Sequence, residues 1–379
     1  MRLIEALRRL GYAGPLTLVS GEAHRPYDRP PLTKAVLRGA ADSTTFPVDM
    51  NALGVDVRLG VRACALDAAD HRVTLVDGTS FEYQSLALAP GATPRWLPGT
   101  AGKGGVHVVR TIDDAVALRE AASSARRVAV VGGGFIGCEV AASLTTVGIV
   151  VDLVEVQPAP LLPQLGPVGA GIVADLLTER GVRLRAGAGV TDVLGDAVVS
   201  GLQLDDGTVL ETDVVVLGLG VIPDVSWLGG SGLRIDDGIT CNGSGRTSAD
   251  GVWALGDAAS WHHPLARGPV RVEHWTSVID QAAVVAEDIV RGEAADLNAV
   301  PYFWSDIFDL RIQALGFVGP SDAVHILTPG GTTVIAYSNG GRLTALVGFS
   351  AARHIMRLRQ CVADSAPIEA VIEKLSDRS

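Results

Sequence analysis

The chain has 379 residues, 47% of them hydrophobic and 19% charged, which suits about two or three globular domains and excludes a disordered tail. Its net charge of −11 at pH 7 argues against non-specific nucleic-acid binding, which needs a basic surface. Because no run of about 18 apolar residues occurs, we expect no membrane-spanning helix.

The first 95 residues predict one helix followed by short strands. Apolar residues recur at helical spacing in residues 1–10, and Leu16–Ser20 reads as an apolar strand. Residues 24–37 form a proline-rich loop that leads into a short helix. Further strands are predicted over 55–59, 72–76 and 86–89, the last ending at Pro90 and Gly91.

A second unit begins near residue 111, with Asp113 and Asp114 as candidate caps of a helix over 115–123. An apolar strand over 127–131 is followed by a glycine-rich segment and a helix over 139–147. Later elements are a strand at 150–154, a helix at 170–179, and strands at 183–185, 198–204, 209–210 and 214–219, with a hairpin turn at 206–207.

The last third begins with a buried strand over 251–257 and a helix over 278–290. From residue 301 onward the pattern is more β-like, with expected strands at 311–317, 323–327, 333–337 and 343–349 and closing helices at 352–361 and 368–375. The order indicates two nucleotide-binding units, one interrupting the other, and a C-terminal α+β unit.

The sharpest motif is a glycine loop. Gly132, Gly134 and Gly137 form G-x-G-x-x-G between an apolar strand and a helix, a pattern that brings backbone and helix N-terminus to a pyrophosphate. Glu155 ends the next strand, where a carboxylate can accept hydrogen bonds from ribose hydroxyls and repel a 2′-phosphate. No arginine follows directly, so NADH is predicted over NADPH. The alternative is a glycine-rich turn of purely structural origin.

The cysteines and paired histidines predict no metal site. Cys64, Cys138, Cys241 and Cys361 are far apart and form no C-x-x-C motif, which argues against a thioredoxin-type disulfide and an all-cysteine zinc site. We expect a reducing, cytoplasmic compartment, with Cys138 as a small buried hydrophobic residue. The adjacent residues His262 and His263 are interpreted as part of a loop rather than as metal ligands.

Six segments match, in order, the patterns of one known family. They are residues 26–37 (PYDRPPLTKAVL), 86–95 (LALAPGATPR), 128–139 (VAVVGGGFIGCE), 251–259 (GVWALGDAA), 272–282 (VEHWTSVIDQA) and 300–316 (VPYFWSDIFDLRIQALG). The chain thus resembles the FAD-dependent pyridine-nucleotide oxidoreductases of the glutathione-reductase fold. Within them it is similar to the putidaredoxin-reductase-like ferredoxin reductases that serve bacterial dioxygenases and cytochromes P450.

The resemblance implies an α/β fold with two Rossmann-type nucleotide-binding domains and a C-terminal α+β domain. The FAD-binding domain would comprise residues 1–112 and 245–299, and an NAD-binding domain at 113–244 would be inserted into it. Residues 300–379 would form the C-terminal domain.

The implied activity is that of an NADH-dependent ferredoxin reductase, a flavoprotein of EC class 1.18.1. Hydride would pass from NADH to FAD, and single electrons to a [2Fe–2S] ferredoxin. The protein is expected to be a cytoplasmic monomer or homodimer, with a local arginine surface for an acidic ferredoxin. Two alternatives stay open: an FAD-deficient, NAD(H)-binding regulatory protein, or a reductase whose acceptor is rubredoxin, a quinone or oxygen.

The resemblance also assigns site residues. Lys34, near flavin N5 and paired with Glu139, and Trp275, beside the flavin ring, are the catalytic candidates. The expected FAD-binding residues are Glu22, Arg29, Lys34, Ala63, Pro90, Gly91, Arg95, Gly256, Asp257, His274 and Trp275. The expected NAD-binding residues are Gly132, Gly134, Phe135, Ile136, Gly137, Glu155, Gly218 and Gly220. His274 is expected to be structural rather than an acid–base group.

Plainer roles compete with the catalytic ones: an exposed lysine at a helix start for Lys34, a first-turn helix acid for Glu139, and core packing for Trp275. Two features also depart from the family pattern. Residues 1–11 match the second half of the helix that follows the family's first glycine loop, so either the start lies upstream or FAD binding is weakened or lost. Pro90 stands where the family has Thr, which removes an N–H and a hydroxyl at that turn.

Overall fold

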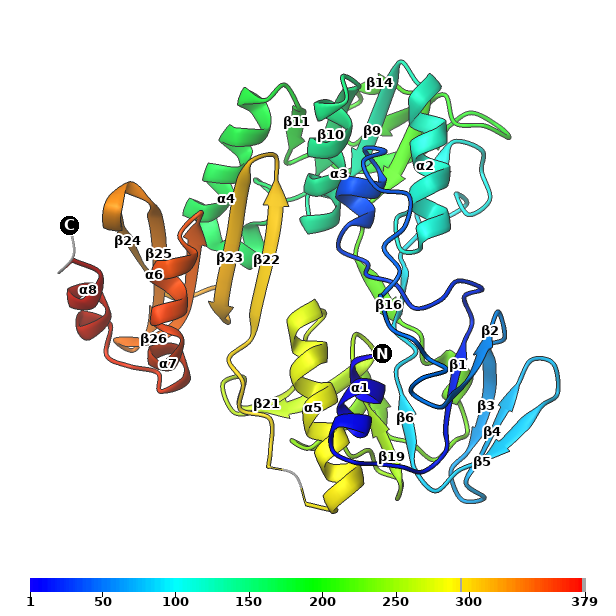
Figure 1. Cartoon of the computed structure of the whole chain (residues 1–379). Coiled ribbons are helices and arrows are strands. Elements are labelled where there is room, and N and C mark those ends of the chain that lie inside the picture. Colours follow the sequence, from blue (N-terminus) through cyan, green and yellow to red (C-terminus); the bar gives the residue numbers. More distant parts are fainter. Residues whose placement is uncertain (294, 377–379) are drawn as a thin grey trace. The chain divides into compact units, whose positions relative to one another are not determined.

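The computed structural model describes residues 1–293 and 295–376, and the chain divides into two compact units. Unit 1 comprises Met1–Asp28, Thr45–Thr93 and Pro223–Phe303, and unit 2 comprises Arg29–Thr44, Pro94–Ile222 and Trp304–Ser379. Two of the unit boundaries fall within the short strands β7 (Ala92–Pro94) and β16 (Val221–Pro223), and a third falls within β22 (Tyr302–Ile307). Figure 1 is coloured by residue number, so the segments of each unit can be traced along the chain. The three predicted domains and their limits stay a prediction, because a division into two compact units does not show which nucleotide each part of the chain binds.

Unit 1 is built from small sheets and one pair of packed helices, α1 and α5. Its elements are α1 (Arg2–Arg9), β1 (Leu16–Ser20), β2 (Val55–Leu59), β3 (Ala63–Asp67), β4 (Arg72–Leu75), β5 (Ser80–Glu82), β6 (Leu86–Leu88), η2 (Ser226–Leu228), β17 (Ile235–Asp236), β18 (Gly238–Cys241), β19 (Val252–Ala254), β20 (Ala259–His263), β21 (Gly268–Arg271) and α5 (Trp275–Arg291). Strand β1 pairs in parallel with β2, and β6 with β19, while β3, β4 and β5 form an antiparallel meander. Helix α1 packs against α5 through Ala6, Leu7 and Ala286.

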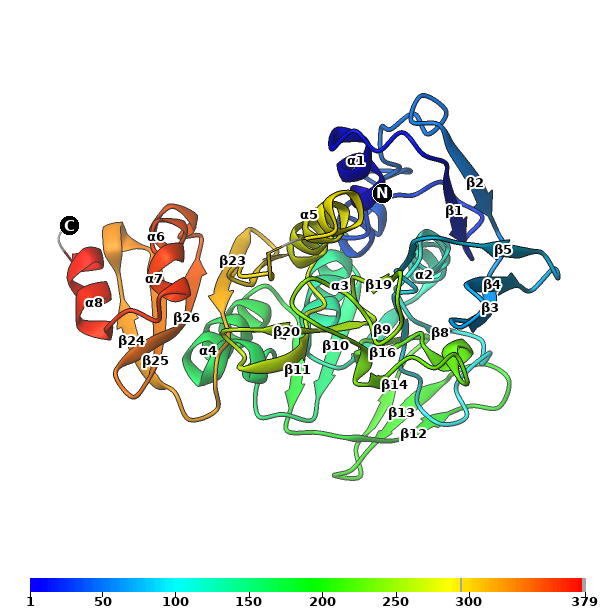
Figure 2. The same cartoon turned by 90° about the horizontal axis from the view of Figure 1, so that it is seen from below.

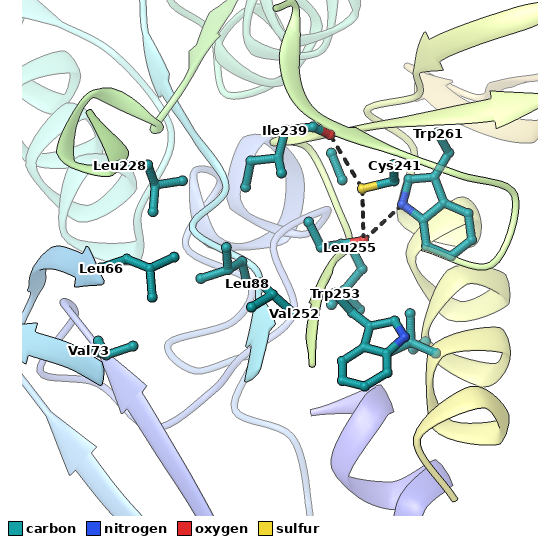
Figure 3. Packing of buried hydrophobic residues seen from close by; sticks show 14 of the residues in the cluster. Leu66, Val73, Leu88, Leu228, Ile239, Cys241, Val252, Trp253, Leu255 and Trp261 are labelled. Atoms are coloured by element: carbon teal, nitrogen blue, oxygen red, sulfur yellow. Dashed lines mark hydrogen bonds between the residues drawn. The ribbon is translucent and has the colours of Figure 1, made fainter. Parts of the chain in front are cut away.

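The core of unit 1 ties α5 to the strands beneath it. Trp261 donates its indole N–H to the carbonyl of Ala254 at 2.9 Å, among the buried side chains in Figure 3. Trp253 donates to the carboxylate of Asp288 on α5 at 2.7 Å, and Arg246 pairs with the same carboxylate at 2.6 Å. Since a buried carboxylate without partners is costly, these contacts fix the position of α5 and therefore of its first residues.

Unit 2 contains a five-stranded parallel sheet in the order β11-β10-β9-β15-β8. The elements are η1 (Leu32–Val36), β8 (Val106–His107), α2 (Ile112–Ser124), β9 (Arg127–Val131), α3 (Phe135–Thr146), β10 (Val150–Glu155), α4 (Leu162–Glu179), β11 (Arg183–Ala186) and β15 (Val214–Leu217). Strands β9 and β15 are almost wholly apolar, because a parallel strand is covered on both faces. The strands β12 (Val190–Leu194), β13 (Gly201–Leu204) and β14 (Val209–Glu211) form an antiparallel sheet, and the hairpin predicted at 206–207 is confirmed.

The C-terminal part of unit 2 is a second five-stranded sheet, in the order β22-β23-β26-β25-β24. Its elements are β22 (Tyr302–Ile307), β23 (Leu310–Gly316), β24 (Ala323–Leu327), η3 (Pro329–Gly331), β25 (Thr333–Asn339), β26 (Arg342–Phe349), α6 (Ala352–Arg357), α7 (Arg359–Ala363) and α8 (Ile368–Ser376). Figure 2 shows the three helices beside β24, β25 and β26. Tyr337 in β25 donates its buried hydroxyl to the carbonyl of Leu165 in α4. This hydrogen bond connects the C-terminal sheet to a helix that follows strand β10 of the parallel sheet.

Three expectations about local structure need correction. The N-cap residue of helix α2 is Thr111, and Asp114, one of the two expected caps, is the acidic member of its capping box: Thr111 accepts from the Asp114 N–H at 3.2 Å, and the Asp114 carboxylate accepts from the Thr111 N–H at 2.8 Å. Helix α4 begins at residue 162 instead of 170. The earlier start was missed because Gly166 and Pro167, residues that usually end a helix, lie within its first turns. The single helix expected over 352–361 is two helices that meet at Leu358.

Candidate functional site

The glycine loop between β9 and α3 has two glycines required by packing and one that faces open space. A Cβ at Gly132, whose φ is +104°, would lie 2.4 Å from the Gly218 carbonyl oxygen, and one at Gly137 would lie 1.9 Å from the Gly132 oxygen. A Cβ at Gly134 would meet no atom of the described residues within 4 Å. This opening at the start of α3 is the cradle that a pyrophosphate needs.

Glu155 lies under this loop at the end of β10. One carboxylate oxygen accepts from the Gly133 N–H at 2.5 Å and the other from the Gln157 N–H at 2.6 Å, and the side chain is buried. Each oxygen keeps a second lone pair, so the carboxylate can still accept from ribose hydroxyls. Ile136, on the first turn of α3, is 42% exposed and offers an apolar contact beside the loop. The donor and acceptor set therefore fits NAD(H).

The other residues predicted for NAD lie at the same carboxyl edge of the sheet. Phe135 opens α3, and Gly218 directly follows β15, donating its N–H to the Val131 carbonyl at 2.8 Å. Gly220 is exposed with φ of +78°, and its carbonyl accepts from the Arg95 N–H at 3.0 Å. Ligands of open parallel sheets bind at this edge, which supports the predicted group without testing the individual roles.

The carboxylate of Glu139, in the second turn of α3, is buried and surrounded by donor groups. The ammonium of Lys34 lies 2.6 Å from Oε2, so the expected ion pair is present. Thr33 donates its hydroxyl to the same oxygen at 2.5 Å, and Ser305 donates its hydroxyl to Oε1 at 2.6 Å. Glu139, Thr33 and Ser305 are each no more than 5% exposed. The place of the ion pair beside a flavin stays a prediction.

A cavity of about 240 Å³ adjoins this cluster within unit 2. Its lining residues are Lys34, Arg38, Ala142, Ser143, Thr146, Asp306 and Phe308. Asp306 is paired with Arg311 through two contacts of 2.6 and 3.0 Å, so its charge is compensated locally. The cavity is therefore lined by Lys34 together with two further charged side chains, Arg38 and Asp306.

In unit 1, the N-terminus of α5 carries His274 and Trp275. His274 is the N-cap residue, and its ring lies 4.8 Å from that of Phe303. Burial lowers the pKa of His274 to about 4, although the negative charge of Asp257 opposes the shift. Its Nδ1 is buried and has no hydrogen-bond partner among residues 1–293 and 295–376. A polar group of a bound ligand would satisfy this nitrogen, and the α5 N-terminus would favour a negative one, which fits FAD.

The remaining residues predicted for FAD are distributed over both units. Glu22 follows β1 and accepts from the Tyr27 hydroxyl, and the Gly256 N–H donates to Gln281 at 2.8 Å. Arg29 donates to the Arg110 carbonyl at 2.6 Å. The unit 1 set is Glu22, Ala63, Pro90, Gly91, Gly256, Asp257, His274 and Trp275, and the unit 2 set is Arg29, Lys34 and Arg95.

Sequence reasoning missed Thr33 and Ser305, although both lie inside matched segments. Hydroxyl residues give no signal of their own, because only the tertiary structure shows which buried carboxylate they reach. Cys138 is fully buried as expected, and burial raises the pKa of its thiol well above the usual range. Within the part of the chain that the structure describes, no group of three or more His, Cys, Asp or Glu residues could hold a metal ion.

A glycine loop that fits one dinucleotide, and a buried His274 nitrogen at a helix N-terminus that fits a second, negatively charged cofactor, are typical of an oxidoreductase of the two-dinucleotide class. The chain belongs to the pyridine nucleotide-disulphide oxidoreductase family, whose model matches residues 1–282, and residues 302–379 match the reductase C-terminal domain. No helix within residues 1–293 and 295–376 is long and apolar enough to cross a membrane.

Several characterised proteins are similar over almost their whole length. Rhodocoxin reductase of Rhodococcus erythropolis is 33% identical over 96% of this chain and 87% of that protein. The ferredoxin–NAD(+) reductase component of the anthranilate 1,2-dioxygenase system of Burkholderia cepacia is 35% identical over 96% of this chain and 92% of its own length. The crystal structure of the covalent putidaredoxin reductase–putidaredoxin complex has a TM-score of 0.92 at 28% identity, covering 98% of this chain and 92% of that one.

These matches confirm the predicted family, the α/β fold class with its C-terminal domain, and the class of enzyme. The family uses FAD and NAD(H), so the predicted cofactors are confirmed as well. The individual site residues stay predictions.

Proposed function

We propose that the protein is an NADH-dependent ferredoxin reductase of an oxygenase or cytochrome P450 system. The observation that carries the proposal is the glycine loop, open at Gly134 with Glu155 held beneath it, in a chain that also holds the Lys34–Glu139 pair. The relatives named ferredoxin–NAD(+) reductase support the choice of acceptor.

Bound FAD would supply the redox chemistry, taking hydride from NADH and passing on single electrons. The chain's own residues bind and orient the two cofactors. The α3 N-terminus holds the NADH pyrophosphate, and Glu155 selects the unphosphorylated ribose. Lys34, paired with Glu139, would supply a positive charge to the flavin. The N-terminus of α5 at Trp275 would supply a partial positive charge that favours a negative group of the cofactor.

The proposed partner is a [2Fe–2S] ferredoxin, and the proposed setting is the cytoplasm, with the protein acting as a monomer or homodimer. An acidic ferredoxin would dock on a local arginine surface, since the net charge of −11 opposes association with another acidic protein. The departure at Pro90 makes flavin content the first quantity to measure.

Purified protein tests the proposal directly. We expect a flavin absorption band, bleaching of that band by NADH without oxygen, and reduction of an added [2Fe–2S] ferredoxin. Lys34→Met should slow the bleaching, whereas Lys103→Met should not, because Lys103 contacts the Val193 carbonyl at 2.6 Å and lines no part of the site.

Two results would contradict it. Colourless protein that binds NADH would favour the FAD-deficient regulatory reading. Normal bleaching without electron transfer to any ferredoxin would favour rubredoxin, a quinone or oxygen as acceptor.

A further inference from the structure

We propose that Thr33 and Ser305 are positioning residues that fix the Glu139 carboxylate and, through it, the ammonium of Lys34. The proposal deepens the proposed function and rests on it, because that function assigns Lys34 to the flavin. Its geometric part stands on contacts within unit 2 alone.

The donors come from two segments that lie far from Glu139 in the sequence, η1 with Thr33 and Lys34 and β22 with Ser305. Thr33 belongs to η1 and Ser305 to β22, which are 106 and 166 residues away from Glu139 in α3. Ser305 lies in the region that matches the reductase C-terminal domain. The carboxylate is therefore the point at which this C-terminal region contacts the ion pair.

The division of donors between the two oxygens fixes the carboxylate plane. The terminal torsion of a glutamate side chain is broad, so one bonded oxygen leaves the other free to rotate. Here Oε1 accepts from Ser305 while Oε2 accepts from Thr33 and Lys34. Removal of Ser305 would leave a buried oxygen to find another donor, and the carboxylate would turn.

The position of Lys34 follows from that of the carboxylate. Its ammonium is on a flexible stem of four carbons and has two partners, Oε2 of Glu139 at 2.6 Å and the Pro30 carbonyl at 3.3 Å. If the carboxylate turns, Oε2 of Glu139, the closer of these two partners, moves, and the Lys34 ammonium moves with it. Since misplacement by about 1 Å can slow a reaction by about 100-fold, the two hydroxyls affect hydride transfer without touching the reacting atoms.

Ser143 offers a matched control in the same helix as Glu139. Its hydroxyl donates to the backbone carbonyl of Thr33 at 2.7 Å, and it is buried like the other members of the cluster. It therefore anchors the η1 segment but does not contact the carboxylate. A purely structural role of the cluster predicts the same behaviour for Ser143 and Ser305.

The first test compares hydroxyl removal with hydroxyl retention in the flavin-loaded enzyme. We expect Thr33→Val and Ser305→Ala to make the flavin midpoint potential more negative and to slow NADH-driven bleaching about tenfold. Thr33→Ser keeps the hydroxyl and should restore both. Ser143→Ala should lower the thermal unfolding midpoint but move the potential less than Ser305→Ala does, because Ser143 does not contact the carboxylate. A wild-type potential in Thr33→Val and Ser305→Ala would overturn the proposal.

The second test needs no flavin and uses urea unfolding of the full chain. Ser305→Ala should lower the urea midpoint less in a Glu139→Gln background than in the wild type, because a neutral amide gives the hydroxyl a weaker acceptor. Equal shifts in the two backgrounds would overturn the proposal that Ser305 fixes the Glu139 carboxylate. Wild-type protein without bound flavin would instead contradict the proposed function while leaving this second test intact.

Discussion

His274 shows how burial sets the charge of a single residue. Its imidazole is neutral at ordinary pH, because desolvation lowers the pKa from 6.5 to about 4. The unfolded chain binds a proton there below about pH 6.5, and the folded chain does not until about pH 4. The free energy of unfolding should therefore fall by about 1–3 kcal/mol as the pH drops through this window.

Urea midpoints between pH 7 and pH 4.5 measure this dependence. His274→Gln should show a shallower slope than the wild type, though not a flat one, because burial also lowers the pKa values of His107 and His263. Identical slopes in His274→Gln and wild type would contradict the assignment.

Glu155 is expected to decide between the two nicotinamide cofactors. Its carboxylate repels a 2′-phosphate, and an amide would not. Glu155→Gln should lower the ratio of kcat/KM for NADH over NADPH by about tenfold. Initial rates with both cofactors measure the ratio, and Asp152→Asn, on the same strand but paired with Arg183 and Arg185, is the control. An unchanged ratio in Glu155→Gln would contradict the prediction.

At the residue level, the sequence predicted the Lys34–Glu139 pair but missed its two hydroxyl partners. A lysine and a glutamate can be matched to a family pattern one at a time. The contacts of Thr33 and Ser305 depend on η1, α3 and β22 meeting at one point, which local pattern cannot show.

The element that joins β9 to α3 makes opposite demands on its glycines. Gly137→Ala should destabilise the protein by about 3 kcal/mol or more, because the new Cβ would lie 1.9 Å from the Gly132 carbonyl oxygen. Gly134→Ala should fold normally, since the added methyl enters open space, but should raise the KM for NADH about tenfold.

Thermal unfolding and initial rates distinguish the two variants. The same substitution three residues apart should change stability in one case and nucleotide binding in the other. Loss of folding in Gly134→Ala, or wild-type stability in Gly137→Ala, would show that the loop geometry differs from the one described.

Elements with continuous apolar runs were predicted best. Strands β9, β10 and β15 are buried between helices, so their composition alone identifies them. Strand β3 was missed because its residues are mostly exposed and alternate weakly. The start of α4 was missed because Gly166 has a φ of +63° inside the helix and Pro167 follows it, a combination that normally marks an end.

At the scale of the whole molecule, net charge and local charge predict opposite effects of salt. Two acidic proteins that met by net charge would associate faster as salt screens their repulsion. A local arginine surface requires the reverse, so the rate of reduction of an acidic ferredoxin should fall several-fold from about 20 to about 200 mM salt.

The ferredoxin reduction rate at saturating NADH measures this effect, and the rate of flavin bleaching at the same salt concentrations is the control. A rate that rises with salt would show that net charge, −11 for this chain, governs the encounter. The proposed arginine surface would then be wrong.

The sequence by itself determined the family, the order of the nucleotide-binding elements and the glycine loop, because these depend on short, contiguous patterns whose physical demands are local. Only the tertiary structure decided which groups share a carboxylate, which glycine faces open space and which histidine nitrogen is buried without a protein partner in the described chain. The shared carboxylate arises where segments more than 100 residues apart come into contact, and burial changes the chemistry of a side chain only after the chain has folded around it.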